Sequence, residues 1–137
     1  MDINELILSD AAVEGIETGA WVGDIPDLPG IRLKVLGSSA KAHVKANQTK
    51  LEAARKKSRK DLSAEQAADC IREVLAEVTL VDWDGITDGG KPVKFDRELA
   101  KKWLTSRNGK KLADAVFWAA QKLDQDANSY VESVTKN

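Results

Sequence analysis

Apolar and polar side chains alternate along residues 31–36. Ile31, Leu33 and Val35 would face one side of a strand, and the two basic residues between them would face the other. The preceding stretch, Pro26–Gly30, combines two prolines with a glycine, a composition typical of tight turns. The pattern predicts one strand of a β-hairpin. Since an isolated hairpin is only marginally stable in water, helices are expected to cover its apolar face.

The rest of the N-terminal region is also predicted to be extended. Residues 21–25 are short and mostly apolar, and they supply the first strand of the hairpin. A further strand is predicted near residues 12–16, with Gly19 closing it. Residues 1–37 are therefore predicted to form a β-rich N-terminal part.

Residues 38–126 favour helix. Ser39 follows a break in the pattern and is a candidate N-cap for the first helix. Ser63 and Gln66 have the spacing of a capping box, in which two backbone donors of a helix start are satisfied reciprocally. The helix that begins there should end near Thr79, where β-branched residues take over.

Two more helices are predicted beyond a connector that contains several glycines. Asp96 is the candidate N-cap of the first, and the second begins near Lys110. Helical spacing places the following side chains of the last three helices on buried faces: Ala67, Ile71, Val74, Leu75 and Val78; Leu99, Ala100, Trp103 and Leu104; and Ala113, Val116, Phe117, Ala120 and Leu123.

These elements predict a single α+β domain over residues 1–137. Its N-terminal β-hairpin or small antiparallel sheet would pack against about four α-helices. Residues 127–137 turn polar and are predicted to be a frayed tail.

The overall composition fits a globular domain. The chain has 137 residues, 42% of them hydrophobic and 31% charged, with a net charge of −1. It opens without a basic start or a long apolar core, and no apolar run reaches the length that crosses a bilayer. The single cysteine, Cys70, excludes an internal disulfide and is expected to be a small buried thiol in a reducing compartment. These features predict a cytoplasmic protein without a membrane partner.

The residues that could carry catalysis or bind a metal are sparse. His43 and Cys70 are the only residues of their types, so they cannot form a zinc site of the usual kind. Three acidic residues at 82, 84 and 88 resemble a calcium loop, but its twelfth position is Val93 instead of glutamate. A phosphate-binding loop is also absent from the sequence. We therefore expect neither an enzyme, nor a metal, nor a cofactor.

Charge is concentrated in the first predicted helix. Residues 40–60 carry eight basic side chains and a single acidic one, Glu52. This segment could bind nucleic-acid phosphates, dock an acidic partner or an acidic surface of another copy, or simply be solvated. The absence of interleaved aromatic residues does not favour nucleic acid. The residues of the possible electrostatic patch are Arg55, Lys56, Lys57, Arg59 and Lys60.

Tryptophan is the commonest aromatic residue of the chain. Trp103 and Trp118 lie on or beside predicted apolar helix faces, where core packing is expected, although Trp118 is one position off its stripe. Trp83 lies in the connector, where it could fill the space between two helices or enter a groove of a partner.

The connector and its flanking helices carry a recognisable pattern. They resemble the helical part of the tail assembly chaperones of long-tailed bacteriophages. The resemblance lies in these segments: Leu80-Val-Asp-Trp-Asp-Gly-Ile86, Gly90-Lys-Pro-Val-Lys-Phe95, Asp96-Arg-Glu-Leu-Ala-Lys-Lys-Trp-Leu104 and Leu112-Ala-Asp-Ala-Val-Phe-Trp-Ala-Ala120. The motifs span a little under half of the chain, and the basic helix has no counterpart in the pattern.

The resemblance implies a role without catalysis in the host cytoplasm. Such chaperones bind the tape measure protein, bring tail tube subunits (the major tail protein) to it, and are usually absent from the mature virion. Several copies acting together, as a homo-oligomer, would be compatible with this role. The residues that the resemblance and the aromatic pattern suggest for partner binding are Trp83, Phe95, Trp103 and Trp118.

Many of these chaperones are also made in a longer form by ribosomal frameshifting. Thr135-Lys136-Asn137 is compatible with a slippery heptamer in the gene, which its nucleotide sequence would test. Two alternatives to the chaperone remain: a structural or head–tail component of the virion, and a nucleic-acid-binding module that uses the basic helix.

Overall fold

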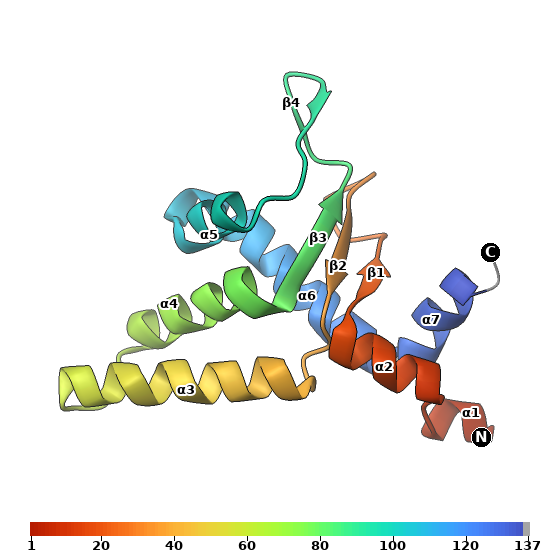
Figure 1. The fold of residues 1–137 in the computed structure, drawn as a ribbon, viewed down its shortest axis with the longest axis horizontal. Coiled ribbons are helices and arrows are strands. Elements are labelled where there is room, and N and C mark those ends of the chain that lie inside the picture. The colour runs from red at the N-terminus through yellow and green to blue at the C-terminus, as the bar shows by residue number, and fades with distance from the viewer. Residues whose placement is uncertain (136–137) are drawn as a thin grey trace.

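The computed structural model describes residues 1–135, except for the side chains of Asn4 and residues 132–135 (Figure 1). Its helices are α1 (Ile3–Leu6), α2 (Asp10–Thr18), α3 (Lys41–Ser58), α4 (Ala64–Val74), α5 (Arg97–Thr105), α6 (Lys110–Gln125) and α7 (Ala127–Thr135). A π-helical turn, Leu75–Thr79, extends α4, and a 3-10 turn, Arg107–Gly109, leads into α6. The strands are β1 (Ala20–Val22), β2 (Arg32–Val35), β3 (Leu80–Asp84), β4 (Thr87–Asp88) and β5 (Lys91–Pro92).

The predicted α+β fold is confirmed. β1 and β2 form the predicted antiparallel hairpin, with Val22 opposite Leu33. β3 pairs antiparallel with the other side of β2, where Trp83 lies opposite Leu33, so the sheet order is β1-β2-β3. Residues 80–84 were predicted to be part of a connector, and that prediction was wrong, because they form β3. The tryptophan of the motif therefore belongs to a strand.

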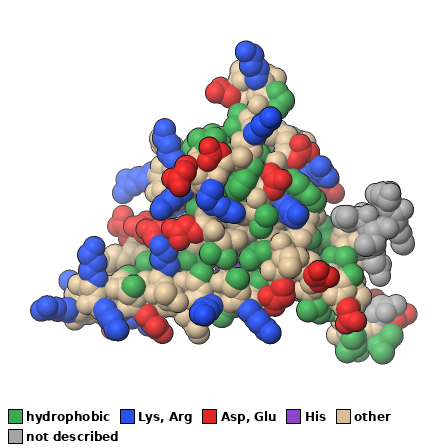
Figure 2. Space-filling model, in the orientation of Figure 1, with side chains coloured by type: hydrophobic (Ala, Val, Ile, Leu, Met, Phe, Trp, Pro, Cys, Tyr) green, Lys and Arg blue, Asp and Glu red, His purple; other side chains and the backbone are tan. Residues whose placement is uncertain are grey.

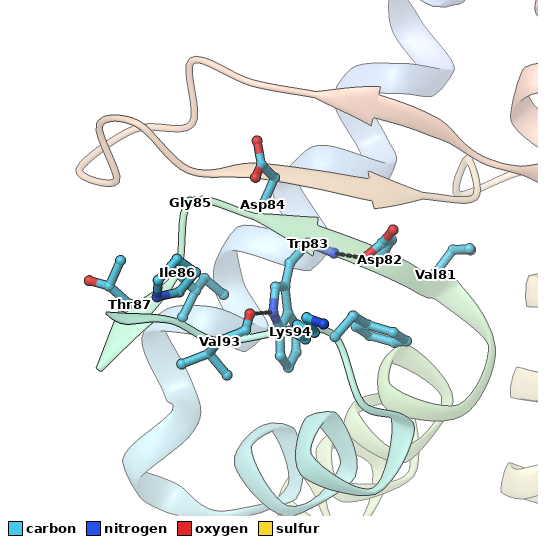
Figure 3. A pocket seen from close by; sticks show the side chains of 11 residues that line it. Val81, Asp82, Trp83, Asp84, Gly85, Ile86, Thr87, Val93 and Lys94 are labelled. Atoms are coloured by element: carbon cyan, nitrogen blue, oxygen red, sulfur yellow. Dashed lines mark hydrogen bonds between the residues drawn. The ribbon is translucent and has the colours of Figure 1, made fainter. Parts of the chain in front are cut away.

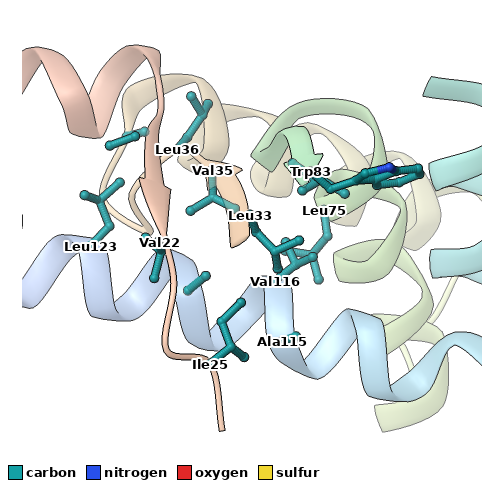
Figure 4. Packing of buried hydrophobic residues seen from close by; sticks show 14 of the residues in the cluster. Val22, Ile25, Leu33, Val35, Leu36, Leu75, Trp83, Ala115, Val116 and Leu123 are labelled. Carbon is teal, nitrogen blue, oxygen red and sulfur yellow. The ribbon is translucent and has the colours of Figure 1, made fainter. Parts of the chain in front are cut away.

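The core lies between this sheet and α6 (Figure 4). Leu33 and Val35 are fully buried, which confirms the alternation seen in the sequence. Val116 and Leu123 of α6 and Leu75 of the π-helical turn belong to the same cluster. The hairpin thus obtains its stability from helix packing, as expected for so small a sheet.

The N-terminal region is less extended than predicted. Residues 12–16 belong to α2, so the strand predicted there was wrong. Ser9 caps α2, because its Oγ accepts a hydrogen bond from the Ala12 amide at 3.0 Å. Ala12 and Ile16 are both buried, four positions apart, which is the spacing of a helix face. A short stretch without clear alternation was therefore misassigned.

The basic helix α3 forms as predicted, but Ser39 is not its N-cap. Ala40 occupies that position without a side-chain cap. Ser39 is instead tied to α6, since its backbone amide donates to Asp124 Oδ1 at 3.2 Å. α3 and α4 lie side by side and form an arm that extends away from the sheet (Figure 1). Lys50 joins the two helices through Glu73, at 2.9 Å.

The other predicted helix starts are confirmed. Ser63 and Gln66 form the capping box, and Asp96 caps α5 by accepting from the Glu98 amide at 2.8 Å. One residue of the α6 stripe was wrong: Phe117 is 45% exposed. The buried face of α6 instead includes Ala115 and the other small residues of the helix, which pack against the sheet.

The C-terminal segment is ordered further than predicted. Residues 127–135 form α7, which packs against α2 instead of fraying. Its Asn128 side chain accepts from the Ser9 amide at 2.8 Å and donates to the Ile7 carbonyl at 3.1 Å. The rest of the predicted frayed tail, residues 136–137, lies outside the described residues, as does most of the Thr135–Asn137 segment. None of the helices in the described part of the chain is long and apolar enough to cross a membrane.

Candidate protein-binding groove

Three of the four aromatic residues proposed for partner binding lie together. The Trp83 ring stacks on Trp103 at a centroid distance of 5.2 Å and packs edge-to-face with Phe95 at a centroid distance of 4.9 Å. The indole Nε1 of Trp83 donates to the Val93 carbonyl at 2.7 Å (Figure 3). Trp83 is only 5% exposed, so it fills the space between β3, the following segment and α5. The burial of Trp83 therefore favours the interpretation in which it fills internal space over the one in which it enters a groove of a partner.

The turn after Trp83 depends on a glycine. Gly85 has a φ of +89°, a conformation that L side chains rarely adopt, and a Cβ there would overlap the carbonyl oxygen of Gly30. The backbone after β3 therefore lies directly against the loop between β1 and β2. This contact brings Ile86 close to Leu28 and Ile31 of that loop.

These residues form one side of an apolar groove of about 430 Å³, which we call the Trp103 groove. A volume of this size lies within the ~300–1,000 Å³ range typical of ligand pockets. Trp103 itself is half-buried and open to the groove, whereas its stacking partner is not. The lining residues are Leu28, Ile31, Ile86, Trp103, Ser106, Asn108, Gly109, Lys111 and Leu112.

The far side of the groove is built by the turn between α5 and α6. A Cβ on Gly109 would overlap the carbonyl oxygen of Trp103, so the glycine allows the two helices to approach closely. This approach holds Leu112 beside Trp103. The groove is thus formed by three segments distant in sequence, each fixed by a close backbone contact or by aromatic stacking.

Two neighbouring hollows differ in character. One, of about 550 Å³, lies between β3 and residues 92–95 and mixes Phe95 with Asp82, Asp84 and Lys94 (Figure 3). The other, of about 240 Å³, contains Trp118 beside Ile25 and the Leu28 loop. The structure therefore does not bring Trp118 into the aromatic cluster, although Leu28 lines both its hollow and the Trp103 groove.

The predicted electrostatic patch is far from the groove along the chain. Arg55, Lys56 and Lys57 lie in the last turn of α3, where positive charge suits the helix dipole. Arg59 ends the helix with a φ of 60°, and Lys60 follows it. All five side chains are exposed, and within residues 1–135 none of them forms an ion pair. The patch lies at the free end of the arm (Figure 2).

The single histidine is a core residue. His43 is 6% exposed, with Nδ1 2.6 Å from Thr79 Oγ1 and Nε2 3.1 Å from the Asn47 side-chain amide. Burial lowers its pKa, and the negative charge of Asp124 opposes part of that shift. Cys70, expected to be buried, is half-buried. Among the described residues, no group of three or more His, Cys, Asp or Glu side chains could hold a metal ion.

The sequence matches a known protein family. Residues 36–137 match a family described as YdaY prophage protein. The chain belongs to this family. YdaY prophage proteins are phage-related, which agrees with the phage context suggested by the motifs, while the match does not specify a tail chaperone. The YdaY match includes Ile86, Trp103 and Leu112 of the groove and begins after Leu28 and Ile31. No curated protein and no solved structure matches the chain.

Four apolar residues of the groove were not identified from the sequence. Leu28 and Ile31 were assigned to a turn and a strand, Ile86 to the connector and Leu112 to a helix start. A weak signal was present, because Leu28 lies between two prolines where no strand could bury it. The convergence of these residues depends on tertiary contacts that no sequence period reveals.

Proposed function

We propose that this phage-related protein is a tail assembly chaperone that acts without catalysis in the host cytoplasm. It would bind the tape measure protein, bring tail tube subunits to it and leave before the virion is complete. Membership of a prophage protein family and the resemblance over residues 80–104 support this proposal. The observation that carries it is the Trp103 groove, an open apolar surface framed by close backbone contacts and aromatic stacking.

The groove suits an amphipathic helical client. A helix presents apolar side chains at i, i+3, i+4 and i+7, and such a stripe can be covered by an apolar groove. The tape measure protein is expected to be long and helical, so its apolar stripes need cover until the tube closes around them. Leu28, Ile86 and Leu112 would contact the client, while Trp83 supports Trp103 from behind.

Co-expression with the tape measure protein of the same prophage tests the proposal. We expect a soluble complex with the wild-type chain and loss of client solubility with Ile86→Asp, which places a charge in the groove. The milder Ile86→Ala should weaken recovery without a large loss of stability. Val44→Asp is the matched control, because Val44 is a 42% exposed apolar residue on α3, outside the groove. An insoluble client with the wild-type chain, or equal loss with Val44→Asp, would refute the proposal.

The exposed basic patch supports a second candidate, nucleic-acid binding. Five exposed cations that form no ion pair with the described side chains lie at the end of an arm. They could contact phosphates, and such binding falls steeply with salt. Replacing the cations at 55, 56, 57, 59 and 60 with glutamine should abolish nucleic-acid binding in this case and leave client recovery unchanged. A third alternative, a structural or head–tail component of the virion, would be distinguished from a chaperone by its presence in purified particles.

A further inference from the structure

The N-terminal segment is the most exposed apolar part of the described chain. We define the N-terminal segment as residues 1–8. Its large apolar side chains are Met1 (95% exposed), Ile3 (67%), Leu6 (66%), Ile7 (61%) and Leu8 (39%). Within the described residues, only Val13, Val44 and Phe117 are further large apolar side chains with this degree of exposure. Figure 2 shows these apolar atoms at the lower right end of the molecule, where α1 lies.

The segment has the form of a docking element. The Ile7 amide donates to the Ile3 carbonyl at 2.8 Å, which continues the turn of α1. Ile3, Leu6 and Ile7 therefore recur at i, i+3 and i+4, the spacing with which short helices insert into apolar grooves. Asn128 holds the end of the segment through the Ile7 carbonyl, at 3.1 Å. The apolar face is thus presented away from the core on a fixed base.

The segment cannot fill the Trp103 groove of its own chain in this arrangement. The groove lies at the start of α6, with Gly109 and Leu112, whereas Asn128 lies beyond the other end of that helix. The 16 residues of α6 span about 24 Å. Figure 1 accordingly shows the N-terminus and α5 at opposite sides of the molecule. An occupant with this sequence must come from another copy.

Charge favours binding of the N-terminal segment to the groove of another copy. Residues 1–8 carry two acidic side chains, Asp2 and Glu5, and no basic one. The groove has a basic rim, since Lys111 lines it and Arg107 is exposed in the adjacent turn, where it makes a long ion pair with Glu65 at 3.9 Å. Lys110 in the same turn is already paired with Asp114, at 2.7 Å. An acidic segment with an apolar face and an apolar groove with a basic rim are complementary in both respects.

We propose that the N-terminal segment of one copy docks in the Trp103 groove of a second copy. Because the two surfaces are different, the contact is heterologous, and repeating it produces an open chain or a closed ring instead of a symmetric pair. The proposal concerns the groove assigned to the client above, but it does not depend on the client. Its test uses the protein alone, so its failure and that of the chaperone proposal can be distinguished.

Sedimentation velocity over a concentration series tests the proposal with two complementary variants. The segment variant, Ile3→Asp with Leu6→Asp, alters exposed side chains and should fold normally. The groove variant, Ile86→Asp, alters the other surface, and Ile86→Ala serves as a milder form. We expect self-association by the wild-type chain, and an increase in the dissociation constant of about tenfold or more for each variant alone. Val44→Asp should associate like the wild type.

Mixing the two variants gives the decisive result. Each has one intact surface, so the groove variant can place its segment in the groove of the segment variant. A 1:1 heterodimer that grows no further is expected. A monomeric wild-type chain at the highest concentration, a groove variant that still associates, or a mixture without heterodimer would each overturn the proposal.

Discussion

Replacement of Trp83 tests whether the aromatic cluster is a structural frame. Trp83 is 5% exposed, stacks on Trp103 and packs edge-to-face with Phe95. Truncation of a buried tryptophan to alanine costs about 3–5 kcal/mol, because it removes apolar contacts and leaves a cavity. Since the contacts with the Trp103 and Phe95 rings and the hydrogen bond to Val93 are lost together, we expect a cost of about 4 kcal/mol for Trp83→Ala. With a urea m-value of about 2 kcal/mol/M, the midpoint would fall by about 2 M.

The milder Trp83→Phe separates the hydrogen bond from the ring. Phenylalanine retains much of the stacking but leaves the Val93 carbonyl without its indole donor, which costs about 1–3 kcal/mol. Urea unfolding followed by far-UV circular dichroism measures both variants without relying on tryptophan fluorescence. A cycle with Trp103→Leu should give a coupling of about 0.5–1.5 kcal/mol, typical of an aromatic pair.

Trp118→Ala is the matched control, because Trp118 is half-buried and outside the cluster. It should cost clearly less than Trp83→Ala. The reasoning is refuted if Trp83→Ala costs under about 1 kcal/mol, or no more than Trp118→Ala. A client-binding defect in Trp83→Ala would therefore report on the frame and not on direct contact.

Three further predictions concern stability. Gly85→Ala should lower the free energy of unfolding more than Gly90→Ala. The two glycines have a similar φ (+89° and +85°), but only at Gly85 would a Cβ overlap Gly30. Urea unfolding of both variants measures the difference. The contribution of His43 to the free energy of unfolding should be constant well above about pH 6.5 and fall as the pH drops below it. Burial lowers the pKa of His43 in the folded chain, so at low pH the unfolded chain binds the extra proton. In His43→Gln this part of the pH profile should flatten. Arg97→Ala and Arg97→Lys should both lower the thermal midpoint, since the Arg97 guanidinium donates to the carbonyls of Ala76 (2.9 Å) and Leu80. An Arg97→Lys variant with the wild-type midpoint would contradict this prediction.

The two proposals for the groove make a joint prediction. If a client helix and the N-terminal segment of a neighbour occupy the same site, the client should dissociate self-associated protein. A client peptide added during sedimentation should then lower the average mass of the protein, in proportion to the groove sites filled. An unchanged mass at saturating peptide would show that the sites are separate.

Local signals were sufficient to predict much of the fold. The alternation at Leu33 and Val35 reflects one buried sheet face, and the Ser63 and Asp96 caps satisfy backbone donors within a few residues. These features depend on neighbouring residues, so the sequence shows them directly. The hairpin and four helix regions could be predicted for this reason.

Other features depend on contacts between distant segments. β3 is a strand because it pairs with β2. Val81-Asp82-Trp83-Asp84 alternates apolar and polar residues, but over only four positions directly after a helix, so the run was assigned to the connector. Residues 12–16 were predicted to be a strand, whereas they lie within α2, whose start depends on the cap at Ser9. The groove required the close contact between Gly85 and Gly30, which no local pattern indicates.

The most direct test of the central claim is a methyl NMR titration. A peptide carrying an amphipathic repeat of the tape measure protein would be added to the protein with labelled Ile, Leu and Val methyl groups. The account predicts saturable shift changes at Leu28, Ile31, Ile86 and Leu112, with Val44 unchanged. Groove methyl signals that stay fixed at saturating peptide, or changes confined to the basic arm, would contradict it.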